Sequence, residues 1–478
     1  MKKNDAFLNF KATGFAAAGL MAMLPLFAQA SDPRPNVLFI SIDDLRPVLG
    51  AYGESQMHTP NIDALADVGV TFDRAYCQFP ACGPSRASMM SGVHPARSPR
   101  PSDWHVDRFA PDATTLPEYF RNQGYYTVGN GKIFHMVDQA AERSWSEPPF
   151  SLVNGEDFNH MTTRDPVASR MIGGRRERTP FFELPEVEDD AYIDGVTADK
   201  TIKDMERLSK MDQPFFLAVG LIRPHLPFYA PKKYWDLYDR DAIVLAPNRA
   251  LPLNAPNQLR GNAEFQSYHP GIFEYNSDAF HRVARHGYFA SVSYIDALVG
   301  NILQKLDELG LRDNTIVVIF GDHGFMLGEH NLWAKHNLLD PAIRSPLIIS
   351  APGLSQGKTS DALVELVDVY PTLLELTGLP APESQLTGTS LVPWLQSPEA
   401  PGKPAVFSHH QAINGWTIRT DRFQLIQYFN GRGDVAAEIL FDMHADPLQE
   451  VNVVGMEAYG PELEELRAML KAHLQLQK

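Results

Sequence analysis

Asn36-Val37-Leu38-Phe39-Ile40-Ser41-Ile42 is a continuous apolar run that begins after Pro35 and ends at two aspartates. Its length and composition are typical of a strand buried on both faces of a mostly parallel sheet. Residues 214–220 and 315–320 have the same character, and helical patterns lie between the runs, among them a helix predicted over residues 288–309. The sequence therefore predicts an α/β fold, with a mixed, mostly parallel sheet flanked by helices.

Polar side chains follow the predicted strands. Open α/β sheets bind ligands at the carboxyl ends of their strands, so these side chains are candidate site residues. Each also has a structural explanation, because aspartate is common in loops after strands and a lone histidine is usually structural. The candidates are Asp43 and Asp44, Lys132 and His135, His225, and Asp322 and His323, with Lys335 in a following loop.

The chain has two cysteines, Cys77 and Cys82. In an exported protein such a pair suggests one disulfide, and a lone thiol in a globular core is usually inert. Cys82, however, opens the segment Cys82-Gly83-Pro84-Ser85-Arg86, just before a helix start rich in small residues. That is an unusual place for a core thiol, so both interpretations stay open at this point.

With this pentapeptide the chain resembles the type I sulfatases, whose C-x-P-S-R cysteine is oxidised to formylglycine. Further motifs match the family in the expected order, namely D-D, T-P-N-I-D, P-F-F-L-A-V-G with R-P-H-L-P-F, D-H-G, G-E-H and W-A-K. The spacing G-K-x-x-H at residues 131–135 is that of the iduronate-2-sulfatase branch. The resemblance implies an alkaline-phosphatase-like catalytic domain and a smaller C-terminal α+β domain with an antiparallel sheet.

The resemblance also implies roles for the candidates. Formylglycine at position 82 would supply the nucleophile as its hydrate, held by Arg86, while Lys132, His135 and Lys335 contact the sulfate. His225 would protonate the leaving alcohol. One Ca²⁺ ion would be held by Asp43, Asp44, Cys82, Asp322 and His323. A formylglycine-generating or anaerobic sulfatase-maturating enzyme is an expected partner.

The expected activity is hydrolysis of a sulfate monoester of a carbohydrate, such as a sulfated uronate. A phosphatase or phosphonate monoester hydrolase of the alkaline-phosphatase superfamily is the alternative, although Ser85 favours a sulfatase. We also hypothesise that Trp104, His105, Arg108 and Phe325 shape the sugar subsite. The identity of the sugar stays open.

The first thirty residues have the pattern of a secretory signal peptide. Lysines precede an apolar run over residues 15–27, and Ala28-Gln29-Ala30 is a small-x-small cleavage site. We therefore expect a cut after Ala30 and a periplasmic or secreted protein with no membrane anchor. Loss of three lysines and one aspartate with the leader would change the net charge from −16 to −18.

This acidic net charge argues against nucleic acid as a partner, because like charges repel at long range.

Beyond the signal peptide of residues 1–30, the sequence predicts a catalytic domain over 31–400 and a C-terminal subdomain over 401–478. The subdomain is expected because short alternating segments after residue 401 predict an antiparallel sheet, followed by a helix over 461–476.

Overall fold

The computed structural model describes residues 34–152, 171–172, 175–176, 180–261, 264–268, 272–354, 356–382 and 384–475. The predicted signal peptide, residues 1–30, lies outside the described residues. Among the residues that are described, no helix is both long and apolar enough to cross a membrane.

The central sheet is built around strand β1 (Asn36–Ile42), the run from which the fold was predicted. The strand order is β12-β2-β13-β9-β1-β7-β3, with β14 paired to β2. Strand β1 lies parallel to its neighbours β7 (Phe215–Leu221) and β9 (Thr315–Gly321), and β3 (Tyr126–Gly131) lies parallel to β7. Strand β13 (Leu347–Ser350) is antiparallel to β9, so the sheet is mixed and mostly parallel, as predicted.

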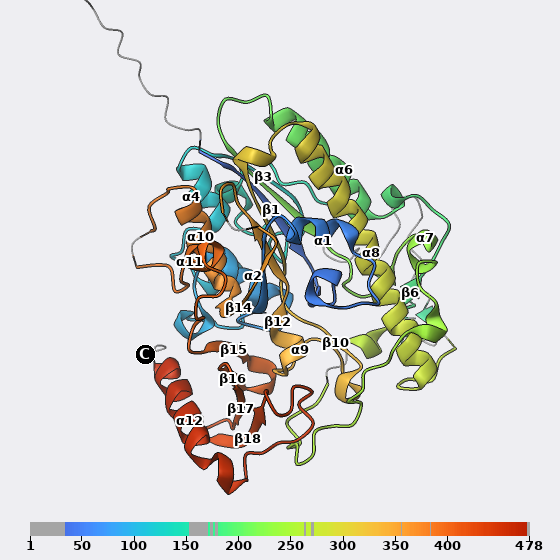
Figure 1. The fold of residues 1–478 in the computed structure, drawn as a ribbon, viewed down its shortest axis with the longest axis vertical. Helices are drawn as coiled ribbons and strands as arrows, with labels where there is room; N and C mark the ends of the chain where they lie inside the picture. The colour runs from blue at the N-terminus through green and yellow to red at the C-terminus, as the bar shows by residue number, and fades with distance from the viewer. Residues whose placement is uncertain are drawn as a thin grey trace, which may run out of the picture. The chain divides into compact units, whose positions relative to one another are not determined.

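Both faces of the sheet are covered by helices (Figure 1). Alternate residues of β1 point to opposite faces, so Val37 and Phe39 pack in one core cluster and Leu38 and Ile40 in the other. The first cluster includes residues of α2 (Cys82–Ser91), α4 (Leu116–Asn122) and α10 (Val369–Leu376). The second includes residues of α1 (Pro60–Ala66), α6 (Ile193–Leu208) and α8 (Asp278–Glu308).

Helix α8 begins ten residues earlier than its apolar pattern predicts. The sequence favoured a start at Tyr288, but the helix starts at Asp278, where the Ser277 hydroxyl accepts a hydrogen bond from the backbone N–H of Phe280. This side-chain cap satisfies one of the free N–H groups of the first turn.

The C-terminal residues form a second sheet, an antiparallel meander of four strands: β15 (Val406–His410), β16 (Gly415–Arg419), β17 (Phe423–Phe429) and β18 (Val435–Asp442). Helix α12 (Gly460–Leu474) packs on this sheet through Leu463, Leu466 and Leu470. The predicted antiparallel sheet and terminal helix are therefore both present, while the domain boundary at residue 400 stays a prediction.

The remaining elements are the other three strands of the central sheet, β2, β12 and β14, and short elements outside that sheet. They are β2 (Val70–Tyr76), α3 (Val106–Phe109), α5 (Ala141–Ser144), β4 (Met171–Ile172), β5 (Arg175–Arg176), β6 (Phe182–Glu183), β8 (Phe228–Tyr229), α7 (Lys232–Trp235), β10 (Met326–Leu327), β11 (Trp333–Ala334), α9 (Asp340–Ile343), β12 (Arg344–Ser345), β14 (Lys358–Glu365) and α11 (Val392–Gln396), with 3-10 turns between them.

His409 connects the second sheet to the segment before α2. Its backbone N–H donates to the carbonyl of Gln78, and its ring stacks on Trp416 with centroids 4.2 Å apart. The ring Nδ1–H donates to the carbonyl of Gly415 at 3.0 Å. Burial lowers the pKa of His409 to about 4, so the folded protein holds this ring uncharged.

We predict that this histidine makes the protein less stable in acid. In the unfolded chain it takes up a proton below pH 6.5, whereas in the folded chain it does so only near pH 4. Its contribution to stability is therefore complete above pH 6.5 and is lost progressively between pH 6.5 and about 4.

Urea unfolding at pH 7.5 and pH 5 measures the effect. Between these pH values the free energy of unfolding should fall by about 2 kcal/mol more in the wild type than in His409→Gln. Equal losses in the two proteins would contradict the prediction.

Candidate active site

The predicted strand-end residues lie together at one edge of the central sheet. The backbone N–H groups of Asp43, Asp322 and Lys132 each donate to a carbonyl oxygen of the neighbouring strand, at 2.9–3.2 Å. Gly220 permits this close approach, because a Cβ there would lie 2.0 Å from the Lys132 carbonyl oxygen. The hydrogen bonds between the strands thus continue one residue beyond the strand ends and fix these site residues relative to one another.

Cys82 is the first residue of α2 and is buried at this edge. Its Sγ lies 3.3 Å from Nε2 of His323 and 3.8 Å from Oδ1 of Asp44. Burial and the neighbouring Asp43 raise the pKa of the Cys82 thiol well above its usual value. Cys77 and Cys82 are both free thiols in the structure, which does not support the alternative of a disulfide.

Arg86 lies on the same helix, one turn after Cys82, and is fully buried. Its Nε donates to Oδ2 of Asp322 at 2.8 Å, and its Nη2 donates to Oδ1 of Asp43 at 3.1 Å. Nη1 donates to the carbonyl oxygens of Lys132 and Ile133. One planar guanidinium therefore connects the ends of three strands, a geometry that lysine cannot reproduce.

Two lysines complete the positive charge of the site. Lys132 Nζ donates to Oδ2 of Asp43 at 2.5 Å, and Lys335 Nζ donates to Oδ1 of Asp44 at 2.8 Å. Burial alone would raise the pKa of Asp43, but Lys132 and Arg86 hold it well below its usual value. Both lysines keep a pKa above the usual value because these carboxylates offset the effect of burial.

The two predicted histidines differ in their surroundings. His225 donates from Nδ1 to the carbonyl of Leu226 at 2.6 Å, and its Nε2 faces Oδ2 of Asp44 at 4.0 Å. His135 packs edge-on against Trp104, with ring centroids 5.5 Å apart. Burial, together with Lys132, lowers the pKa of His135 to about 3, and burial with Lys335 lowers that of His225. Both rings are therefore uncharged near neutral pH.

A divalent cation fits the donor set at this edge. Asp43, Asp44, Asp322 and His323 are all fully buried, and His323 donates from Nδ1 to the carbonyl of Gly324, which leaves Nε2 facing the site. Asp44 has a left-handed backbone with φ 59°, and its N–H donates to Oδ1 of Asp322 at 3.1 Å. Carboxylate oxygens are the ligands that Ca²⁺ and Mg²⁺ prefer.

The possible ligand atoms are close enough to share one ion. In each of two groups they lie within 4.8 Å of one another: Asp43, Cys82, Asp322 and His323, and Asp43, Asp44, Cys82 and His225. The five predicted ligands are divided between these two groups, which share Asp43 and Cys82, and neither group contains all five; His225 is an additional neighbour.

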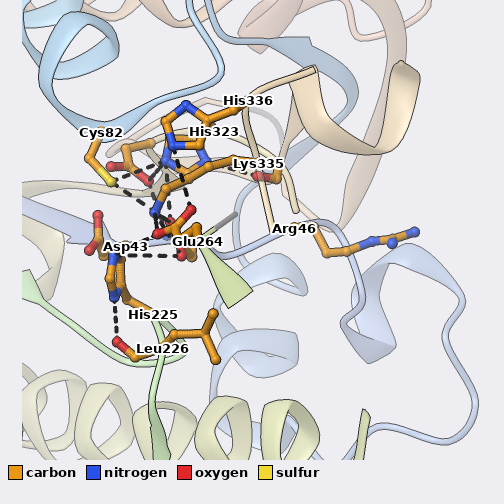
Figure 2. Close-up of polar contacts among 12 residues, drawn as sticks. Asp43, Arg46, Cys82, His225, Leu226, Glu264, His323, Lys335 and His336 are labelled. Carbon is orange, nitrogen blue, oxygen red and sulfur yellow. Dashed lines mark hydrogen bonds and ion pairs between the residues drawn. The ribbon is translucent and has the colours of Figure 1, made fainter. Parts of the chain in front are cut away.

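Three further residues at the site were not predicted: Glu264, His336 and His410. Glu264 lies among Lys335, His225 and His336, as Figure 2 shows, whereas Arg46 points away from this cluster. Glu264 belongs to the irregular segment between β8 and α8, and no motif or periodicity marks it. His336 directly follows the W-A-K motif, which is the one sequence signal that could have indicated it. His410 ends a strand of the C-terminal sheet, far from the other site residues in the sequence.

A cavity of about 740 Å³ opens above Cys82. Trp104 forms part of its wall with 43% of its surface exposed, and the Arg108 guanidinium lies 5.2 Å from the Trp104 ring centroid. His105, Arg108 and Phe325 do not line this cavity, and the prediction for Phe325 is wrong. Phe325 is fully buried and stacks on Tyr288, because the chain after His323 turns into the core. The cavity is lined by Phe79, Ala81, Cys82, Gly83, Pro84, Ser102, Trp104, His135, His225, Glu264, Lys335, His336, His410, Gln411 and Ala412.

Comparison with known proteins identifies the family. A family model for sulfatases matches residues 35–379, and a model for the C-terminal part of N-sulphoglucosamine sulphohydrolase matches residues 328–478. The chain therefore belongs to the sulfatase family, whose members are sulfuric ester hydrolases.

Individual relatives agree with the family assignment. A sulfatase of Formosa agariphila is 34% identical over 91% of this chain and 86% of its own length. Iduronate 2-sulfatase of Mus musculus is 30% identical over 90% of this chain and 93% of its own length. The relatives thus include the iduronate-2-sulfatase branch that the G-K-x-x-H spacing indicated.

A solved structure shares the fold. The phosphonate monoester hydrolase of Agrobacterium radiobacter superposes with a TM-score of 0.73 at 22% identity, over 93% of this chain and 96% of that one. This likeness supports the predicted architecture and carries no assignment of reaction.

We predict that Arg86→Lys destabilises the protein by about 3 kcal/mol, because the lysine keeps the charge but leaves buried carboxylate and carbonyl oxygens without their partners. Chemical denaturation measures the change. The matched control is Arg108→Lys at the exposed pair with Asp103, which should change stability by less than about 0.5 kcal/mol. Equal effects of the two substitutions would contradict this account of Arg86.

Proposed function

We propose that this protein is an exported carbohydrate sulfatase that hydrolyses a sulfate monoester of a sugar, with formylglycine formed from Cys82. The observation that carries the proposal is the position of Cys82. Cys82 is the first residue of helix α2, in the segment C-G-P-S-R, and it lines the cavity. It lies beside three buried carboxylates and three buried cationic side chains. A maturating enzyme of the formylglycine-generating or anaerobic type would make the modification.

The residues at this site fit formylglycine and a Ca²⁺ ion. Formylglycine would supply, as its hydrate, one hydroxyl as the nucleophile toward sulfur and a second through which the aldehyde is restored. A Ca²⁺ ion held by Asp43, Asp44, Asp322 and His323 would supply positive charge beside the sulfate oxygens. The remaining chemistry belongs to side chains of this chain.

Lys132 and Lys335 provide the charge that a sulfate ester needs. The ester is negatively charged, and it reacts only where positive charge surrounds its oxygens. Both side chains are buried, Lys132 against Asp43 and Lys335 against Asp44, and Lys335 also lines the cavity. Arg86 keeps the carboxylates of Asp43 and Asp322 in place, since its guanidinium is paired with both.

His225 would protonate the leaving alcohol, a step for which its ring must first take up a second proton, on Nε2. Its Nδ1–H is used by the Leu226 carbonyl, so the ring is fixed with Nε2 toward the cavity. His135 lines the cavity at Trp104 and is available to accept a proton from the nucleophile.

A sugar is the proposed leaving group. Trp104 is 43% exposed and forms part of the cavity wall, and aromatic side chains pack well against pyranose rings. The mouse relative is an iduronate 2-sulfatase, which favours a sulfated uronate as the substrate of this protein. A phosphonate monoester hydrolase is the alternative that shares this fold, and Ser85 in the C-x-P-S-R segment supports the sulfatase.

The test is sulfate release from a panel of sulfated monosaccharides and disaccharides, including uronate 2-sulfates, with phenyl phosphonate as the competing substrate. The wild type, produced with a maturating enzyme, should release sulfate from at least one sugar. Cys82→Ser should be inactive or become sulfated at position 82, because its single hydroxyl cannot restore an aldehyde. Full turnover by Cys82→Ser, or activity on the phosphonate alone, would contradict the proposal.

A further inference from the structure

Glu264 joins the groups on the leaving-group side of the cavity. Its Oε1 lies 3.0 Å from Nζ of Lys335 and 3.6 Å from Nε2 of His225, and its Oε2 lies 3.5 Å from Nε2 of His336. Figure 2 shows these side chains converging on the carboxylate. Burial alone would raise the pKa of Glu264, but Lys335 and the two imidazoles hold it well below its usual value, so it is ionised.

Lys335 is held from two sides. Its Nζ donates to both carboxylate oxygens of Asp44, at 2.8 and 3.0 Å, and Glu264 contacts it from the cavity side. Lysine is a flexible point charge with many rotamers, so two anionic partners are needed to fix its ammonium at one position.

The second sheet reaches this carboxylate through a pair of histidines. Nδ1 of His336 lies 3.0 Å from Nε2 of His410, the last residue of β15, and both side chains line the cavity. His410 is buried, and burial together with His336 lowers its pKa to about 3, so it is uncharged. His336 therefore lies between Glu264 and the C-terminal sheet, and its contact with His410 is a hydrogen bond between two imidazoles.

We propose that Glu264 is a positioning residue for the sulfatase reaction: its carboxylate fixes Lys335 and the ring of His225 where the leaving oxygen departs, and His336 and His410 hold it in place. The inference rests on the proposed function, because His225 acts as the acid only if a sulfate ester is cleaved there. Glu264 itself does not touch the reacting atoms in this account.

The chemistry explains why a carboxylate suits this position. A proton donor is effective only when it is held within hydrogen-bond reach of the leaving oxygen. A carboxylate 3.6 Å from Nε2 of His225 orients the ring, and the same carboxylate keeps Lys335 from turning away from the sulfate. An amide of the same shape keeps the space but loses the ionic contact.

The test is a double-mutant cycle with Glu264→Gln and His225→Asn, measured on the sugar sulfate from the panel that the wild type cleaves best. Glu264→Gln should lower kcat by about 10- to 100-fold and change KM by less than about threefold. In the His225→Asn background the same substitution should cost at least about threefold less than in the wild type, because the part of its effect that passes through His225 is already lost and only the part through Lys335 remains.

The control variant is Glu438→Gln in the C-terminal sheet, another partly buried carboxylate that is ion-paired, here with Arg467, and it should leave kcat and KM unchanged. If Glu264→Gln does not fold, Glu264→Asp serves in the same cycle, since it keeps the charge and shortens the reach. Losses that multiply independently, or a change in KM alone, would overturn the inference. A wild-type enzyme that releases no sulfate from any sugar would instead overturn the proposed function and the inference with it.

Discussion

The buried charge at one edge of the sheet is the constraint on which the rest of the structure depends. Three aspartates with no solvent exposure, Asp43, Asp44 and Asp322, end two adjacent strands. Such a cluster costs much free energy unless cations and hydrogen bonds compensate it. Arg86, Lys132 and Lys335 supply that compensation, and each must come from a different part of the chain.

This requirement explains several features of the fold. Four parallel strands place their carboxyl ends side by side, which brings the aspartates and Lys132 together. Helix α2 must start at Cys82 so that Arg86, one turn later, reaches the strand ends. Gly83 allows the next segment to approach, since a Cβ there would lie 2.2 Å from the Cβ of Trp104. The same contact sets Trp104 beside the cavity.

The sequence was sufficient to predict the sheet and the strand-end residues. Continuous apolar runs followed by Asp43, Asp44 and Asp322 give local signals, and parallel strands end at a common edge whatever the loops do. Glu264 and His410 could not be predicted in the same way. One lies in an irregular segment and the other in the second sheet, so only tertiary contacts bring them to the cavity.

Two errors have the same physical origin. Phe325 was expected at the sugar subsite because it follows the D-H-G motif, but neighbours in sequence can face opposite ways after a strand ends. The start of α8 was placed too late because its first turns are capped by Ser277 rather than marked by apolar periodicity. The direction of the Phe325 side chain and the cap at Ser277 both depend on local backbone geometry and hydrogen bonds, which a pattern of apolar residues does not indicate.

The account's central claim is that position 82 carries an aldehyde in the active protein. Trypsin cleaves after Arg74 and Arg86, so mass spectrometry of the peptide covering residues 75–86 tests it directly. The account predicts that, in protein produced with a maturating enzyme, the residue at position 82 has lost its sulfur and gained a carbonyl oxygen. An intact thiol at Cys82 in fully active protein, or a disulfide between Cys77 and Cys82, would contradict it.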